Sequence, residues 1–112
     1  MTEILSPKLV RRQYGDLTLH EHWCPGCNAM HQIAVETAFR NGARWTRDGN
    51  AAAPTFSPSV NHTLRFAPNS GRAAQVGHYF IRSGRIEFCG DSSHALAGQT
   101  VDLPDIPADE LD

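Results

Sequence analysis

The chain has 112 residues, of which 40% are hydrophobic, so it is long enough for one hydrophobic core and too short for two. We therefore expect a single domain over residues 1–112. The formal net charge of −2 at pH 7 argues against nucleic acid as a partner, although three arginines lie close to Trp45 in the stretch FRNGARWTR. The N-terminus lacks the pattern of a secretory signal, and no apolar run approaches the roughly 20 residues of a membrane span, so we expect a cytoplasmic protein.

Short segments that alternate apolar and polar residues predict a mainly β fold. Residues 9–13 and 17–23 are predicted as two strands on either side of a turn at 14–16. His20 and His22 fall on the face of the second strand opposite Leu19, and we expect both to lie at the surface. Residues 31–36 and 60–66 are further candidate strands, and His62 on the latter is expected in the core or at its rim. Residues 37–58 are predicted to be irregular.

The stretch EHWCPGCNAMH spaces Cys24 and Cys27 two residues apart and places His31 downstream. Three cysteines in the whole chain are a poor fit to a disulfide framework. A redox CxxC opens a helix within a βαβ pattern, whereas the residues around this motif alternate like strands. The motif therefore favours a metal knuckle over a redox pair.

The segment VGHYFIRSGRIEFC predicts a β-hairpin at about 76–89, closed by a two-residue turn at Ser83 and Gly84. The turn fixes the register, so that His78 faces Cys89 while Tyr79 faces Phe88. Alternation then places His78 and Cys89 together on one face and an apolar set on the other. Opposed side chains in a sheet are close enough to share one metal ion.

These two patterns predict a structural zinc site held by Cys24, Cys27, His78 and Cys89, since three thiolates and one imidazole suit tetrahedral zinc. Two alternatives stay open. Either His31 or His94 replaces His78 as the nitrogen ligand, or Cys89 is only a small buried hydrophobic residue and no such site forms.

The segment GDSSHALAGQ predicts a short helical turn near 92–97, with Asp91 as its N-cap and Gly98 as its stop. His94 then lies one turn from Asp91, where it is placed to act as an oriented base or as a ligand of a second metal. Residues 104–112 are acidic and rich in proline, and we expect them to form a frayed tail.

Four motifs in this order resemble a family of small domains of unknown function that is widespread in bacteriophages and prophages. The motifs are WCPGC with the following His31, APTFSPSV, GHYFIRSGRIEF and DSSHALAGQTVDLP. Relatives also occur beside bacterial ubiquitin-like conjugation genes as candidate peptidases. The resemblance implies a metal-binding fold, and it matches the polar positions Thr55, Ser57 and Ser59 together with His31, His78, Asp91 and His94. Many relatives carry Cys where this chain has Gly77 and Ser92, which puts a four-cysteine site in doubt.

Two functions follow as hypotheses. In the first, the chain is a zinc-dependent hydrolase of peptide or isopeptide bonds that processes ubiquitin-like proteins. Its catalytic group comprises His31, Ser57 as the candidate nucleophile, Asp91 and His94, with Glu87 as a possible base. In the second, the chain is a non-catalytic, zinc-stapled module of phage origin that binds another protein through an exposed apolar patch. The stretch PTFSPS is equally compatible with a rigid turn that enters a strand.

Overall fold

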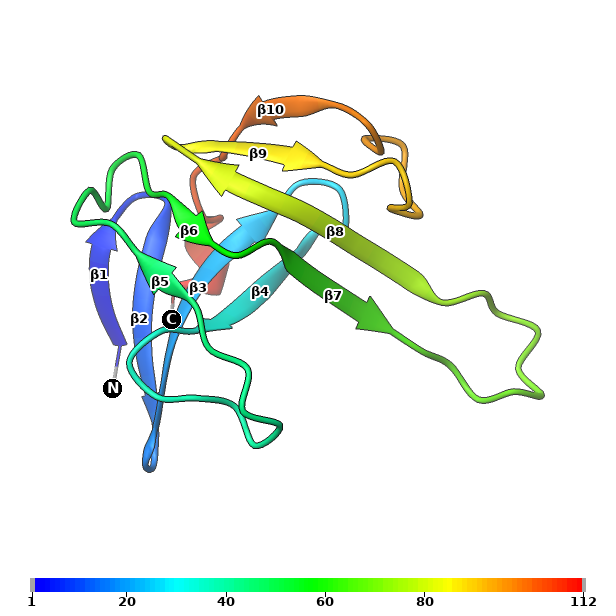
Figure 1. Cartoon of the computed structure of the whole chain (residues 1–112), viewed down its shortest axis with the longest axis horizontal. Helices are drawn as coiled ribbons and strands as arrows, with labels where there is room; N and C mark the ends of the chain where they lie inside the picture. The colour runs from blue at the N-terminus through cyan, green and yellow to red at the C-terminus, as the bar shows by residue number, and fades with distance from the viewer. Residues whose placement is uncertain (1, 112) are drawn as a thin grey trace.

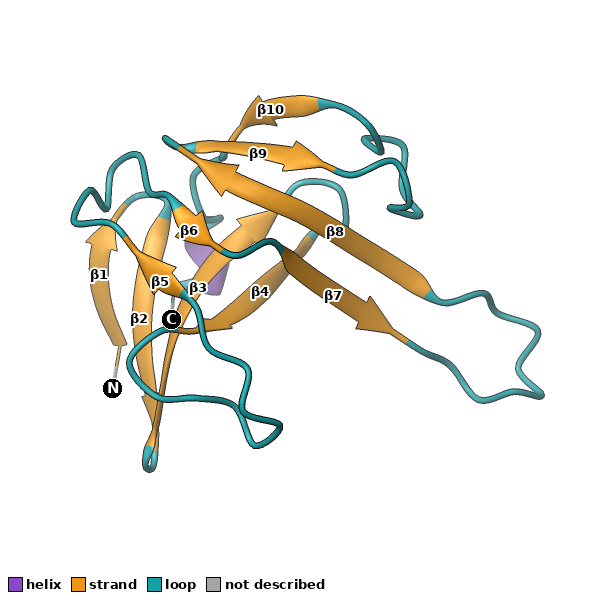
Figure 2. Ribbon diagram, in the orientation of Figure 1, coloured by secondary structure: helices purple, strands orange, loops and turns teal. Residues whose placement is uncertain are grey.

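The computed structural model describes residues 2–111 and confirms the mainly β fold (Figures 1 and 2). One antiparallel sheet has the order β1-β2-β3-β4, a second has the order β10-β9-β8-β7, and β5 pairs with β6. The strands of the first sheet are β1 (Thr2–Ser6), β2 (Leu9–Tyr14), β3 (Leu17–Cys24) and β4 (Ala29–Ala34). The remaining strands are β5 (Thr46–Arg47), β6 (Phe56–Ser57), β7 (Val60–Leu64), β8 (Gln75–Arg82), β9 (Arg85–Phe88) and β10 (Thr100–Asp102).

The two four-stranded sheets pack against each other and enclose one core. Leu9, Cys24 and Ile33 come from the first sheet and lie in the same buried cluster as Tyr79 and Phe88 from the second. Each of these side chains is at most 4% exposed. Burial of this apolar surface is the main force that holds the sheets together.

The β8–β9 hairpin forms in the predicted register. Tyr79 pairs with Phe88, and Ile81 pairs with Ile86, around a turn in which Gly84 has a φ of 77°. All four of these apolar side chains are buried, as the alternation predicts. The Cys89 N–H donates to His78 O at 2.8 Å, so the pairing continues to the end of the hairpin.

The prediction that His20 and His22 lie at the surface is wrong, because β3 is covered on both faces. His20 is 3% exposed and His22 is fully buried. Arg47 of β5 contacts His20, and Tyr79 of β8 contacts His22. Alternation within one strand identifies two faces, and it does not reveal that a second sheet covers the polar one.

The C-terminal third differs from the sequence prediction in two respects. Residues 92–97 form bends and turns, and the only helix among residues 2–111 is a 3-10 turn, η1 (Ala108–Glu110). The segment predicted as a frayed tail packs onto the sheets, since Ile106 is 5% exposed and its N–H donates to Pro7 O. No helix of residues 2–111 is long and apolar enough to cross a membrane.

Candidate active site and metal-ligand cluster

Ser59, His78 and Asp91 form a linear polar array at the edge of the second sheet. Ser59 Oγ lies 3.5 Å from His78 Nε2, and His78 Nδ1 lies 3.0 Å from Asp91 Oδ1. A hydroxyl, an imidazole and a carboxylate in this order are the components of a serine nucleophile with its oriented base. The 3.5 Å separation is long for a hydrogen bond, as is common in catalytic groups without substrate.

The pairing of β7 with β8 brings Ser59 to His78. Asn61 pairs with His78, and Val60 pairs with the buried Tyr79, so Ser59 and His78 share the face that points away from the core. Trp45 holds the serine backbone from outside the sheet, because its Nε1–H donates to Ser59 O at 3.1 Å.

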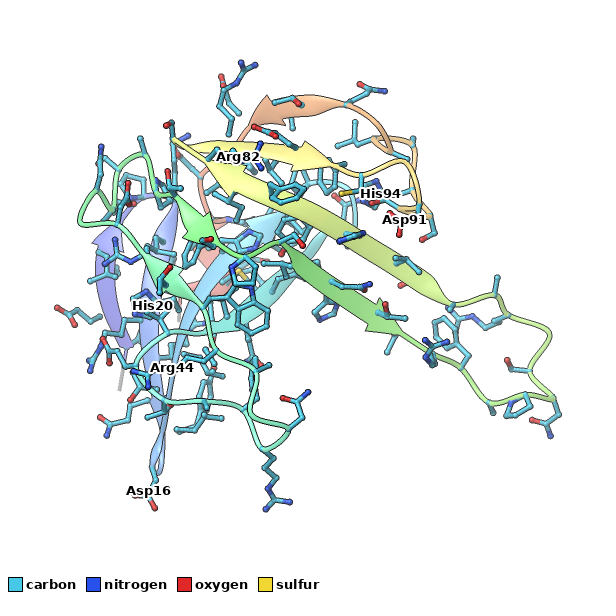
Figure 3. All side chains as sticks on the ribbon, viewed as in Figure 1. Asp16, His20, Arg44, Arg82, Asp91 and His94 are labelled. Atoms are coloured by element: carbon cyan, nitrogen blue, oxygen red, sulfur yellow. The ribbon has the colours of Figure 1, made fainter. Side chains whose placement is uncertain are left out.

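Two serines fix the chain segment that carries Asp91. The Ser92 hydroxyl accepts a hydrogen bond from the His78 N–H at 3.1 Å and donates to His78 O at 3.0 Å. The next residue, Ser93, accepts from the Val76 N–H at 2.7 Å. The turn beyond β9, which carries Asp91 and His94 (Figure 3), is therefore joined to the backbone of β8. The Asp91 carboxylate lies beside the His78 ring.

The array favours one tautomer of the neutral His78 ring. When Asp91 is ionised, it accepts the proton of Nδ1, which leaves the lone pair of Nε2 directed at the Ser59 hydroxyl. The His78 side chain is 28% exposed and that of Asp91 is 63% exposed. The ion pair that forms when His78 takes up a proton is thus open to solvent, and its contribution to stability is small.

Cys89 is a further candidate nucleophile near His78, and its sulfur lies within 4.8 Å of ligand atoms of His78 and Asp91. Burial raises the pKa of its thiol, and the negative charges of Asp91 and Glu87 raise it further. Since the thiolate is the reactive form, this environment disfavours Cys89 as a nucleophile.

Two residues of the predicted catalytic set contact other partners instead of this array. Ser57 belongs to β6, pairs with Thr46 and is exposed. Glu87 forms an ion pair with Arg82, whose Nη1 lies 2.9 Å away. Ser59, two residues beyond Ser57 in the same motif, contacts His78 instead.

A second cluster lies between the sheets, where Cys24, Cys27 and His31 offer ligand atoms within 4.8 Å of one another. The end of β3 and the start of β4 supply this cluster through the turn between them, in which Asn28 has a φ of 51°. Thiolates and imidazole are the ligands that zinc prefers, and the two-residue spacing is typical of zinc knuckles.

Burial governs the protonation of this cluster. Cys24 and His31 are fully buried, and burial raises the pKa of Cys24 to about 12 and lowers that of His31 to about 2. The nearby rings of His22, His62 and His94 lower the pKa of His31 further. His31 is therefore neutral, the form in which an imidazole binds a metal.

Tyr79 was not among the predicted site residues, yet its hydroxyl joins two buried histidines. The oxygen lies 2.9 Å from His31 Nδ1 and 2.7 Å from His22 Nε2. A proton on His31 Nδ1 donates to the tyrosine, and the tyrosine proton then donates to His22. This arrangement leaves a free lone pair on His31 Nε2, which is buried and has no hydrogen-bond partner within residues 2–111.

The residues predicted to hold one metal are thus divided between two groups. Cys24 and Cys27 lie with His31, and His78 and Cys89 lie with Asp91. The predicted facing of His78 and Cys89 is confirmed, whereas nothing in residues 2–111 places either of them in the Cys24 cluster. Among the predicted catalytic residues, His31 adjoins the cysteines and Asp91 adjoins His78.

A family model described as "Bacterial ubiquitination-like system serine protease (BubE)" matches residues 2–89. The match spans more than half of the chain, which therefore belongs to this family. It includes Ser59, His78 and the Cys24 cluster, and it ends two residues before Asp91. No curated protein and no solved structure matches the chain.

Proposed function

We propose, from membership of this serine protease family, that the chain cleaves peptide or isopeptide bonds with Ser59 as nucleophile, His78 as general base and Asp91 as the group that orients His78. The observation that carries the proposal is the 3.5 Å contact between Ser59 Oγ and His78 Nε2, with Asp91 on the opposite ring nitrogen. The proposal gives His78 the role of base instead of metal ligand, and it places Ser59 in the role that the sequence suggested for Ser57.

Each residue has a definite task in the reaction. Ser59 Oγ attacks the carbonyl carbon of the scissile bond while His78 Nε2 takes its proton. When the bond to nitrogen breaks, His78 returns that proton to the leaving amine and the acyl group stays on Ser59 as an ester. A water molecule then attacks the ester, giving its proton to His78, which passes it back to Ser59 as the carboxylate product leaves. Asp91 stabilises the protonated ring at both stages.

The family context and a groove next to Val60, the residue after Ser59, support a proposal for the substrate class. A groove of about 280 Å³ runs along β7, the edge strand of its sheet, and is lined in part by Trp45, Val60 and His62. An edge strand with a groove suits an extended peptide that pairs with it. We propose that the flexible C-terminal tail of a ubiquitin-like protein binds here, with its last carbonyl at Ser59.

A metal-activated water is the other mechanism that the sequence favours. The candidate metal ligands lie between the sheets, and they are Cys24, Cys27 and the fully buried His31. Thiolate and imidazole ligands are typical of structural zinc sites with tetrahedral coordination. His78, Cys89 and Asp91 form the more exposed group, where we propose that the imidazole acts as a base. We therefore propose serine chemistry, with any zinc in a structural role.

The test is cleavage of ubiquitin-like precursors and of ubiquitin-like isopeptide conjugates by the parent and two variants. We expect Ser59→Ala to lower kcat by about 10³-fold or more, because the nucleophile is lost. Ser57→Ala is the matched control from the same motif and should retain activity. Loss of activity in Ser57→Ala with full activity in Ser59→Ala would contradict the assignment. A parent that cleaves no such substrate would favour the non-catalytic binding module.

A further inference from the structure

The sequence and the structure supply a fourth residue beside the cluster of Cys24, Cys27 and His31. The ring of His94 lies on Gly26, the residue between the two cysteines. A Cβ on Gly26 would come within 2.2 Å of His94 Cε1 and 2.3 Å of Nε2. Glycine is thus required at this position for His94 to approach the turn. Close approach of an imidazole to a CxxC turn is the arrangement of a Cys₂His₂ metal site.

The nitrogen atoms of this region are not satisfied by protein partners. Nε2 of His31 and Nε2 of His94 are both buried and have no hydrogen-bond partner among the described residues. Buried polar atoms without partners are rare, and two such nitrogens beside a pair of thiols are the ligands of a cation site. His94 Nδ1 accepts a hydrogen bond from the Leu96 N–H at 3.2 Å. Coordination through Nε2 requires the ring proton to move to Nδ1, so a metal bond replaces this one long hydrogen bond.

Gly77 shows that space at the cluster is limited on the side of β8. A Cβ there would lie 3.1 Å from Cys27 Sγ and 3.3 Å from His31 Cε1. The backbone of β8 therefore closes one side of the cluster directly. His94 lines a small cavity together with Gly26, Cys27, Gln75 and Ser93, which marks the side where the fourth ligand stands.

We propose that Cys24, Cys27, His31 and His94 bind one zinc ion, which fastens the Asp91 turn to the β3–β4 turn. Ser92 and Ser93 attach this turn to β8, and the bond from His94 adds an attachment to the first sheet. The ion is structural, because protein ligands fill all four positions. Its link to catalysis through Asp91 rests on the proposed function, whereas the binding of zinc does not.

The first experiment measures zinc in protein purified without added metal, by elemental analysis, and its affinity by competition with a chelator. We expect one zinc per chain in the parent and in Cys89→Ser, and loss of zinc in Cys27→Ser. His94→Ala should keep three ligands and bind zinc about 10- to 100-fold more weakly. Absence of zinc from the parent, its loss in Cys89→Ser, or unchanged affinity in His94→Ala would overturn the proposed ligand set.

A second measurement does not depend on whether the cysteine variants fold. The absorption spectrum of the parent loaded with cobalt(II) in place of zinc should show tetrahedral coordination with thiolate charge-transfer bands. Gly26→Ala keeps all four ligands, and the added methyl group clashes first with the His94 ring, so this variant should weaken zinc binding as His94→Ala does. An octahedral cobalt spectrum, or a Gly26→Ala variant with parental zinc affinity, would contradict the proposal.

The role in positioning is tested separately from zinc binding. His94→Ala saturated with zinc should show lower kcat with little change in KM, together with a weakened signal of the His78 Nδ1 proton in the NMR spectrum. Full cleavage by Ser59→Ala would refute the proposed function and leave the zinc site standing. If the purified parent contained no zinc and its cleavage activity still required Ser59, the zinc site alone would be refuted.

Discussion

Ser59 and His78 lie on the same outward face of the β7–β8 pair, with Ser59 Oγ 3.5 Å from His78 Nε2. Their neighbours Val60 and Tyr79 are buried between the sheets and form a pair in the ladder. The core on one face of the pair therefore sets the position of the polar residues on the other. This relationship supports the proposed role of His78 as the general base rather than as a metal ligand.

Replacement of Asp91 tests the orientation of His78 while the base itself is kept. Asp91→Asn should lower kcat by about 10- to 100-fold, because the amide no longer stabilises the protonated His78. The effect should be smaller than for a buried aspartate, since the Asp91 side chain is 63% exposed. Steady-state cleavage kinetics measure it, and His78→Ala provides the limit for complete loss of the base. Equal activity of Asp91→Asn and the parent would remove Asp91 from the mechanism.

Cys89 should be dispensable for cleavage. Burial, Asp91 and Glu87 all raise the pKa of its thiol, so little thiolate is present near neutral pH. Cys89→Ala should keep kcat/KM within about threefold of the parent, an order-of-magnitude expectation for a side chain outside the reaction. The same cleavage assay, run with and without a thiol-alkylating reagent, checks this. Inactivation by Cys89→Ala would instead identify a cysteine protease.

Tyr79 should act on the metal cluster through His31. Tyr79→Phe removes the hydroxyl that lies 2.9 Å from His31 Nδ1 and should weaken zinc binding by about 10- to 100-fold. Tyr14→Phe is the matched control, because the Tyr14 hydroxyl contacts Glu21, a residue outside the cluster. Chelator competition measures both variants. Equal zinc affinity of the two variants would show that Tyr79 only packs in the core.

His20 should make the folded protein less stable in mild acid. Burial lowers its pKa below the ordinary 6.5, and the positive charges of Arg47 and Arg11 act in the same direction, while Glu36 opposes them. In mild acid the unfolded chain therefore binds a proton at His20 more readily than the folded chain does. The contribution of neutral His20 to stability is complete above about pH 6.5 and is lost as the pH falls below it.

The corresponding experiment compares urea unfolding of zinc-saturated parent and His20→Gln between pH 8 and pH 5. The free energy of unfolding should fall less steeply with decreasing pH in the variant, because one proton-binding group has been removed from the unfolded state. Parallel pH profiles would show that His20 takes up its proton equally well in the folded chain.

The sequence predicts β2, β3, β4, β7 and the register of the β8–β9 hairpin, because those features are local. It misses β1 and β10, and the prediction that residues 37–58 are irregular is wrong where β5 pairs with β6. Ser83 and Gly84 set the hairpin, and the pairing of Tyr79 with Phe88 follows from the turn. The exchange of roles that we propose between His31 and His78 depends on features that are not local. It depends on which face of β8 meets the first sheet, and on the pairing of β7 with β8 across a connection too long to fix a register.

Ser59 and Tyr79 show the same limit. Ser57 and Ser59 occupy one motif and have the same chemistry, so the choice between them depends on the neighbour that each meets in the fold. Tyr79 was predicted correctly as a core residue. The contacts of its hydroxyl could not be predicted, because they form only when His22 and His31 of the other sheet pack against Tyr79.

The most direct test of the central claim is covalent labelling of the parent with a fluorophosphonate, which forms a stable ester with the activated serine of a serine hydrolase. Peptide mass spectrometry should locate the label on Ser59, and labelling should fall to background in Ser59→Ala and His78→Ala while Ser57→Ala and Cys89→Ala label like the parent. A label on any other residue would contradict the assignment of Ser59 as the nucleophile. Full cleavage activity of the parent after Ser59 has been labelled would contradict it as well.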